Sequence, residues 1–164
     1  KISILPRGLA LGYTLQLPEE DRYLISRSEV IDQITVLMGG RVSEEMVFSE
    51  MTTGAHNDLE RATSLAKKMV CEYGMSALGP RTFGRKDHQI FLGRDIAEMK
   101  DYSEETADKI DAEINSIIDD CLKRAKVILT LNREEMTKIA KVLIEKETLE
   151  NDDLETALKN LHAG

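Results

Sequence analysis

The sequence has no long apolar run. None of its segments approaches the roughly 18–20 consecutive apolar residues that cross a bilayer. No secretory signal is recognisable either. We therefore expect the chain itself to be soluble.

Basic charge is also scarce. The chain carries 22 Lys and Arg against 30 Asp and Glu, a net charge of −8. No dense Lys/Arg cluster stands out, whereas nucleic-acid and anionic-membrane binders normally present one. This balance argues against nucleic acid as a partner and against direct binding to an anionic lipid surface.

Cysteine is limited to Cys71 and Cys121. Both lie in helical patterns, and their spacing is not that of paired metal ligands. We expect two buried thiols in a reducing compartment and no disulfide.

Several catalytic motifs are missing. The chain has no Gly-x-x-x-x-Gly-Lys phosphate loop, no Gly-x-Ser-x-Gly elbow and no His-Glu-x-x-His zinc motif. It does not begin with Met, and its first residues, Lys1 to Pro6, read as a strand already under way. We expect a fragment of a longer protein, with further motifs upstream.

The composition present is that of a globular protein, with 41% apolar and 32% charged residues. We predict one domain over 1–164, mainly α, with a small β element near the N-terminus. Within it we expect a strand region (1–25), two helices (26–73), an irregular segment (74–102) and C-terminal helices (103–161). The basis is apolar spacing of period two in the first region and of helical period in the helical regions. Gly79-Pro80 and Gly84 break any regular pattern in the segment 74–102.

Side-chain caps predict where helices begin. A residue that caps a helix, followed three positions later by an acid, forms a capping box. The sequence offers three such pairs: Ser26 with Glu29, Asn57 with Glu60, and Asn132 with Glu135.

Glycines mark two further features. Gly39 and Gly40 fall inside the first predicted helix, where each costs about 1 kcal/mol relative to Ala. We expect another backbone or side chain to approach closely there. Gly74 is a natural stop for the second helix.

Asp58 is the first candidate for chemistry. It lies in the first turn of the second predicted helix, where the helix dipole alone favours an acid. A metal site would need partners, normally His. The chain offers His56, His88 and His162, and no two have the i, i+4 spacing of a helical zinc pair. The pattern alone therefore leaves Asp58 open between a structural acid and a metal ligand.

Two other segments allow alternatives. Glu44 and Glu45 are adjacent on the first helix and form either a base or ligand pair or a solvated helix face. The strand over residues 8–17 is either an ordinary sheet strand or, at a sheet edge, an acceptor for an extended peptide.

Eight strings, in order and at matching spacing, resemble the peptidase domain of the FtsH family of membrane-anchored ATP-dependent zinc metalloproteases. They cover nearly the whole chain: 2–8, 10–14, 17–21, Gly39-Gly40-Arg41 with Glu44-Glu45, Thr53-Gly54-Ala55 with Asn57-Asp58, 74–76, 91–93 and 145–149.

This resemblance implies a zinc metalloendopeptidase that degrades unfolded or unassembled membrane and soluble proteins. It implies a homo-hexamer with an ATPase ring, ATP and magnesium bound outside this chain, and an N-terminal anchor in a membrane, most simply the bacterial inner membrane, with this domain on the cytoplasmic face. The zinc motif upstream of Lys1 supplies two His ligands and the catalytic Glu, so no catalytic residue lies in this chain and its zinc site is incomplete.

Within the chain the resemblance assigns residue roles. Asp58 becomes the third zinc ligand. Glu44 and Glu45 become potential partners of a ligand His, and the edge strand that binds the substrate peptide corresponds to Ala10, Leu11, Gly12, Tyr13 and Thr14. The C-terminal helices would pack between subunits.

Two alternatives compete with the protease hypothesis. One is an inactive paralogue that serves as a structural, oligomerisation module of the protease ring. The other sets the family aside and interprets the chain as an acidic helical interaction module. In the second case, Asp58→Ala would change stability slightly and leave proteolysis by the full-length protein unaffected.

Overall fold

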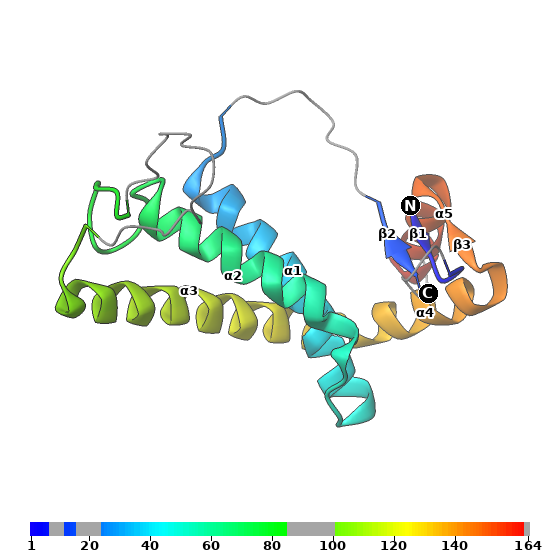
Figure 1. Ribbon diagram of the computed structural model, residues 1–164. Coiled ribbons are helices and arrows are strands. Elements are labelled where there is room, and N and C mark those ends of the chain that lie inside the picture. Colours follow the sequence, from blue (N-terminus) through cyan, green and yellow to red (C-terminus); the bar gives the residue numbers. More distant parts are fainter. Residues whose placement is uncertain (7–11, 16–23, 85–100, 163–164) are drawn as a thin grey trace, which may run out of the picture. The chain divides into compact units, whose positions relative to one another are not determined.

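The computed structural model describes residues 1–6, 12–15, 24–84 and 101–162, with the backbone alone for 157–162. It contains two compact units, one made of residues 1–23 and 128–164 and one of residues 24–127 (Figure 1). The predicted fold class is confirmed, since helices dominate and a small antiparallel sheet includes the N-terminal residues. The single domain over 1–164 stays a prediction, because one domain can hold two contact units.

The unit of residues 24–127 is built on helices α1 (Arg27–Phe48) and α2 (His56–Cys71), which pack side by side (Figure 1). Apolar residues at helical spacing face each other and lose almost all contact with water. The residues of this core are Val30, Ile34, Met38 and Val42 on α1, and Ala62, Ala66, Met69 and Val70 on α2. Burial of these side chains is the main stabilising contribution in the unit.

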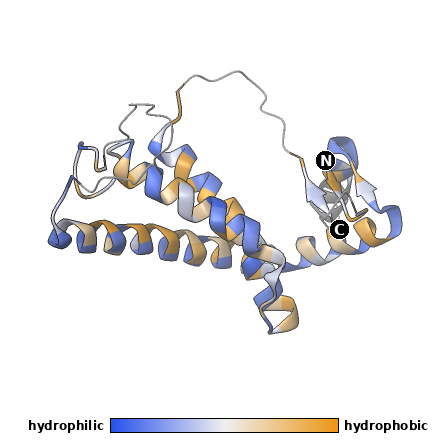
Figure 2. Cartoon of the chain, viewed as in Figure 1, coloured by the Kyte–Doolittle hydropathy of each residue, from blue (hydrophilic) through white to orange (hydrophobic). Residues whose placement is uncertain are grey.

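Helix α3 (Glu104–Leu131) joins α1 through side chains. Cys121 Sγ donates to the carbonyl oxygen of Ile31 over 3.7 Å, and Arg124 Nη1 lies 2.7 Å from Asp32 Oδ1. Hydrophobic and hydrophilic residues alternate along α2 and α3 (Figure 2), as expected for amphipathic helices with one face buried. Cys71 and Cys121 are both buried and form no disulfide, which confirms the prediction.

The other unit holds a three-stranded sheet in the order β2-β1-β3, with both pairings antiparallel. The strands are β1 (Ile2–Ser3), β2 (Tyr13–Thr14) and β3 (Thr148–Leu149). Helices α4 (Arg133–Lys146) and α5 (Asn151–His162) pack on each other and flank β3. The Ser3 and Thr148 hydroxyls lie 2.8 Å apart, and Leu149 is fully buried.

One of the three predicted helix caps forms and two do not. Ser26 and Glu29 form the expected capping box, so that prediction is confirmed. Helix α2 begins at His56, next to Asn57 as predicted, but no side chain caps it. Asn132 ends α3 and is the N-cap residue of α4, as predicted, but its side chain does not bond to α4. Its amide donates instead to Ile128 O on α3, over 2.7 Å, so both predicted side-chain caps are wrong.

The glycine predictions are confirmed in part. Helix α1 runs through Gly39 and Gly40 without interruption. A Cβ at Gly40 would meet Asp58, whereas one at Gly39 would meet nothing within 4 Å. Gly74 follows α2 with φ +59°, the left-handed conformation expected of a helix stop.

A long strand was predicted over residues 8–17. Of these, the structure describes residues 12–15, and Tyr13–Thr14 form strand β2. Residues 7–11 and 16–23 lie outside the described residues. The predicted short strand or tether at 90–93 also lies outside them. None of the described helices combines the length and apolar character needed to cross a membrane.

Candidate metal centre at the start of helix α2

Asp58 lies in the first turn of α2, as predicted, and is partly exposed. Across the described residues, no hydrogen bond or ion pair engages its carboxylate. Its nearest notable neighbour is Gly40 on α1: a Cβ there would lie 3.7 Å from Asp58 Oδ2. The carboxylate is therefore placed by its backbone and left available to an external group. An oxygen donor of this kind fits a divalent zinc ion.

A short capped turn precedes α2. Thr52 caps a short 3-10 turn, η1 (Thr53–Ala55), and its hydroxyl accepts from Gly54 N over 3.0 Å. Helix α2 follows η1 directly. The position of Asp58 is thus set by the turn three residues ahead of it.

Glu44 on α1 holds this turn. Its Oε1 accepts from the Thr52 hydroxyl over 2.8 Å, and its Oε2 accepts from Thr52 N over a longer 3.4 Å. Arg41 adds a weak contact to Thr52 O, at 3.4 Å, and lies 3.6 Å from Glu44 Oε2. Three polar groups of one threonine are therefore engaged by two side chains from a single turn of α1.

Glu45 points to a different neighbour. Its Oε1 lies 3.2 Å from Lys126 Nζ on α3, and both side chains are about half exposed. A surface ion pair of this kind contributes about 0–1 kcal/mol. The adjacent glutamates therefore have separate partners, and neither contact involves a histidine.

Only one of the three histidines, His56, has a side chain that the structure describes. His56 is exposed on α2, His88 lies outside the described residues, and the side chain of His162 is not described. Within residues 1–6, 12–15, 24–84 and 101–156, no three His, Cys, Asp or Glu side chains come together to hold a metal. Within these ranges Asp58 is therefore not part of a complete metal site.

Strand β2 is an edge strand of the described sheet. Lys1 N donates to Leu15 O over 3.0 Å and Leu15 N to Lys1 O over 2.8 Å, so one side of this strand is occupied by β1. A Cβ at Gly12 would lie 2.8 Å from Ser3 O, so this approach requires glycine. The other two predicted substrate residues, Ala10 and Leu11, lie outside the described residues.

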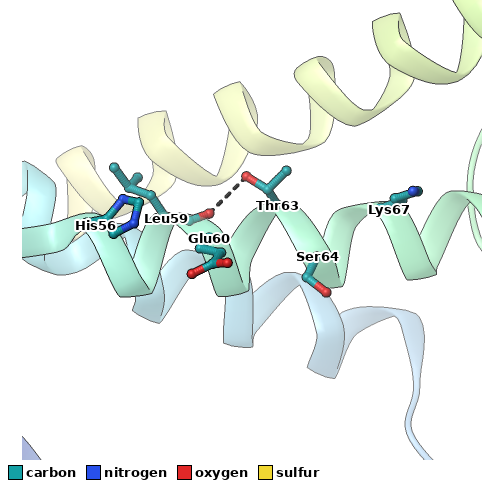
Figure 3. Close-up of a pocket in the computed structure, with 6 residues that line it drawn as sticks. All are labelled: His56, Leu59, Glu60, Thr63, Ser64 and Lys67. Carbon is teal, nitrogen blue, oxygen red and sulfur yellow. Dashed lines mark hydrogen bonds between the residues drawn. The ribbon is translucent and has the colours of Figure 1, made fainter. Parts of the chain in front are cut away.

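A shallow depression of about 430 Å³ runs along α2 (Figure 3). All six lining residues come from this one helix: His56, Leu59, Glu60, Thr63, Ser64 and Lys67. Asp58 is not among them, and Thr63 Oγ1 donates to Leu59 O within the helix over 2.9 Å. The depression is a helix surface and brings no reactive groups together.

Cys121 has no catalytic character. It is 1% exposed, and burial raises the pKa of its thiol above the ordinary value of 9.0. A protonated, enclosed thiol is a poor nucleophile. The chemistry of the described residues therefore centres on Asp58.

The model of peptidase family M41 matches residues 1–157 of this chain. The chain belongs to peptidase family M41. The match includes both units and all of the Thr52–Asp58 segment, and it confirms the resemblance found in the sequence.

M41 proteins from several bacteria are similar to the chain at about half of all positions. "ATP-dependent zinc metalloprotease FtsH" of Acidobacterium capsulatum is 52% identical over 154 residues, which cover 94% of this chain and 24% of that protein. The protein of the same name from Thermotoga maritima is 51% identical over 160 residues, covering 96% of this chain and 26% of that protein. The chain spans about a quarter of the length of these curated relatives.

Sequence reasoning missed the role of Thr52 and Arg41. The Thr52-Thr53-Gly54 string carried a usable signal, since a Thr hydroxyl commonly bonds a backbone N–H two residues on. No local pattern could identify the partner of Thr52 on α1, Glu44, which lies eight residues earlier.

Proposed function

We propose that this chain is part of the peptidase domain of an ATP-dependent zinc metalloendopeptidase. The observation that carries the proposal is Asp58, a partly exposed carboxylate at a helix entrance that has no hydrogen bond or ion pair among the described residues, in a chain that belongs to M41. The names of its relatives, which include zinc, ATP and proteolysis, support it.

In this proposal Asp58 supplies one oxygen ligand, and two His from a His-Glu-x-x-His motif upstream of Lys1 supply the others. A zinc ion so bound lowers the pKa of its water to about 7 and polarises the substrate carbonyl. The chain's own contribution is to hold the Asp58 carboxylate at a fixed place. The catalytic Glu lies outside the chain.

Strand β2 supports a substrate-binding role. An edge strand leaves one row of backbone N–H and C=O groups available, and an extended peptide can pair with them. We propose that Gly12, Tyr13 and Thr14, together with Ala10 and Leu11, accept the substrate backbone in this way. Unfolded segments of membrane and soluble proteins fit such a site, because only an extended chain can pair with a strand.

The whole protein would then be a homo-hexamer with a peptidase ring. ATP and magnesium would bind in an ATPase module outside this chain, and an N-terminal anchor would place the domain on the cytoplasmic side of a bacterial inner membrane. The role of ATP is supported by the names of the relatives. The hexamer, the magnesium and the membrane anchor are supported by the family resemblance alone.

The test is to determine the gene sequence upstream of Lys1 and to assay the full-length product. We expect His-Glu-x-x-His there, and degradation of unfolded casein that needs Mg-ATP and stops when zinc is chelated. If the motif is absent and casein survives while hexamers form, the protein is an inactive structural subunit and the enzyme proposal fails.

A further inference from the structure

We propose that Glu44 is a positioning residue for Asp58. In this role Glu44 binds no metal and touches no substrate. It fixes the Thr52 turn and, through that turn, the start of α2. This inference rests on the proposed zinc function of Asp58. It adds a second residue, Glu44, which would hold Asp58 in the position needed for zinc binding.

The contacts favour the turn as the main partner of Glu44. The Thr52 hydroxyl lies 2.8 Å from Glu44 Oε1, whereas the ion pair of Glu44 with Arg41 is longer, at 3.6 Å. A hydrogen bond to a charged acceptor contributes more than a neutral one. The Glu44 and Arg41 side chains are each 20% exposed, so water competes for these contacts less than at the open surface.

Gly54 shows how closely the turn fits Glu44. A Cβ at Gly54 would lie 2.9 Å from Glu44 Oε1 and 3.2 Å from Thr52 Oγ1. No side chain fits there unless the Glu44 carboxylate moves away. A side chain at position 54 would therefore displace the Glu44 carboxylate from the turn.

The arrangement fixes Asp58 because the connection is short and rigid. Thr52 accepts from Gly54 N, η1 follows, and α2 begins at His56 with no cap of its own. The Asp58 side chain has no hydrogen bond or ion pair among the described residues, so its orientation depends on the backbone that carries it. Groups that orient a metal ligand typically change metal affinity about 10–100-fold when removed.

The experiment compares Glu44→Ala, Glu44→Gln and Thr52→Val in the full-length protein, with Glu50→Ala as the matched control. Glu50 is exposed and has no hydrogen bond or ion pair in the described part of the chain. Zinc affinity is measured by competition with a chromogenic chelator. Hydrogen–deuterium exchange of the peptide spanning residues 52–58 reports the turn independently of zinc.

We expect Glu44→Ala to weaken zinc binding about 10–100-fold and to speed exchange in residues 52–58. Thr52→Val should have the same kind of effect, and the losses in the double variant should be less than additive, because both single variants remove the contact between the Thr52 hydroxyl and Glu44 Oε1. Glu44→Gln should recover part of both, since its amide oxygen still accepts from the Thr52 hydroxyl. Glu50→Ala should change neither.

Unchanged zinc affinity in Glu44→Ala and Thr52→Val, in a protein whose wild type binds zinc, would overturn the positioning role. Additive losses in the double variant would overturn it as well, because the two residues would then act separately. Absence of zinc from the wild type, with residues 52–58 still protected, would instead overturn the proposed function on which the inference rests.

Discussion

The Asp58 carboxylate of α2 lies beside Gly40 of α1, with 3.7 Å between Asp58 Oδ2 and the place of a Cβ on Gly40. Glycine in the middle of a helix lowers the stability of the helix, so we expect a structural reason for Gly40. Its neighbour Gly39 has no atom within 4 Å of the equivalent position. The close approach predicted for the glycine pair therefore belongs to Gly40, and it leaves one side of the carboxylate uncovered.

The two glycines give a matched pair of variants. Gly39→Ala and Gly40→Ala should each stabilise the protein by about 0.5–1 kcal/mol, since alanine reduces the entropy lost on folding. Gly40→Ala alone should weaken zinc binding, because its methyl group contacts the Asp58 carboxylate and crowds the approach. Chelator competition and denaturant unfolding measure the two effects. Equal zinc affinities in the two variants would contradict this account of Gly40.

Replacement of Asp58 by Asn keeps the shape of the side chain and removes its charge. We expect loss of zinc and of casein degradation, with unfolding free energy lowered by about 0.3–1 kcal/mol from the helix dipole. Glu60, an exposed acid two residues later on α2, provides the control: Glu60→Gln should retain zinc. Full peptidase activity in Asp58→Asn would mean that the residue is a structural acid.

Replacement of Gly74 by alanine should destabilise the protein, whereas the same replacement at Gly39 should not. Its φ is +59°, and a Cβ there would lie 3.1 Å from Arg81 N and 3.2 Å from Pro80 Cα. Strain of a non-glycine residue in this region costs about 1–3 kcal/mol, and the backbone atoms cannot move aside as a side chain can. Urea unfolding of Gly74→Ala should show at least this loss. A loss below that of an ordinary surface variant would show that the turn can relax.

Acid should weaken the contact between α4 and α5. A hydrogen bond from Lys146 Nζ, 2.6 Å from Asp153 Oδ1, and a second one from Glu150 N lower the pKa of Asp153 below the ordinary 3.8. Because the folded-state pKa is the lower one, the stabilisation is present above pH 3.8 and is lost as pH falls through the folded-state value.

Asp153→Asn is the variant that checks this. Its melting temperature should lie below that of wild type at pH 7, and the difference should shrink once the pH falls below 3.8. The other carboxyl groups titrate in both proteins and cancel in the comparison. A difference that stays constant from pH 7 to pH 3 would show that Asp153 acts through its shape and not through its charge.

The helices were predictable because their apolar residues recur at helical spacing and are the ones that become buried. Val30, Ile34 and Met38 are examples. Ser26 was also predictable, since a capping box lies within four residues. Two-residue strands such as β3 give too few alternations to be recognised, and β3 forms only because β1 pairs with it.

The candidate site was likewise predictable only where a local sequence pattern marks it. Asp58 could be named from its motif and its place in the first turn of α2. The Glu44–Thr52 contact and the position of Gly40 could not, because each joins residues of α1 to residues beyond it in space. The predicted start of α2 was right to within one residue, but the Asn57 cap was wrong: no side chain caps α2, and the contact between Glu44 and Thr52 lies ahead of it.

The most direct test of the central claim is a zinc-edge anomalous difference map from crystals of the full-length protein. If Asp58 is a metal ligand, we expect a zinc peak about 2.0–2.2 Å from one of its oxygens, with two histidines of an upstream motif completing the site. A zinc peak bound without Asp58, or no zinc beside an intact upstream motif, would contradict the claim that Asp58 is a metal ligand.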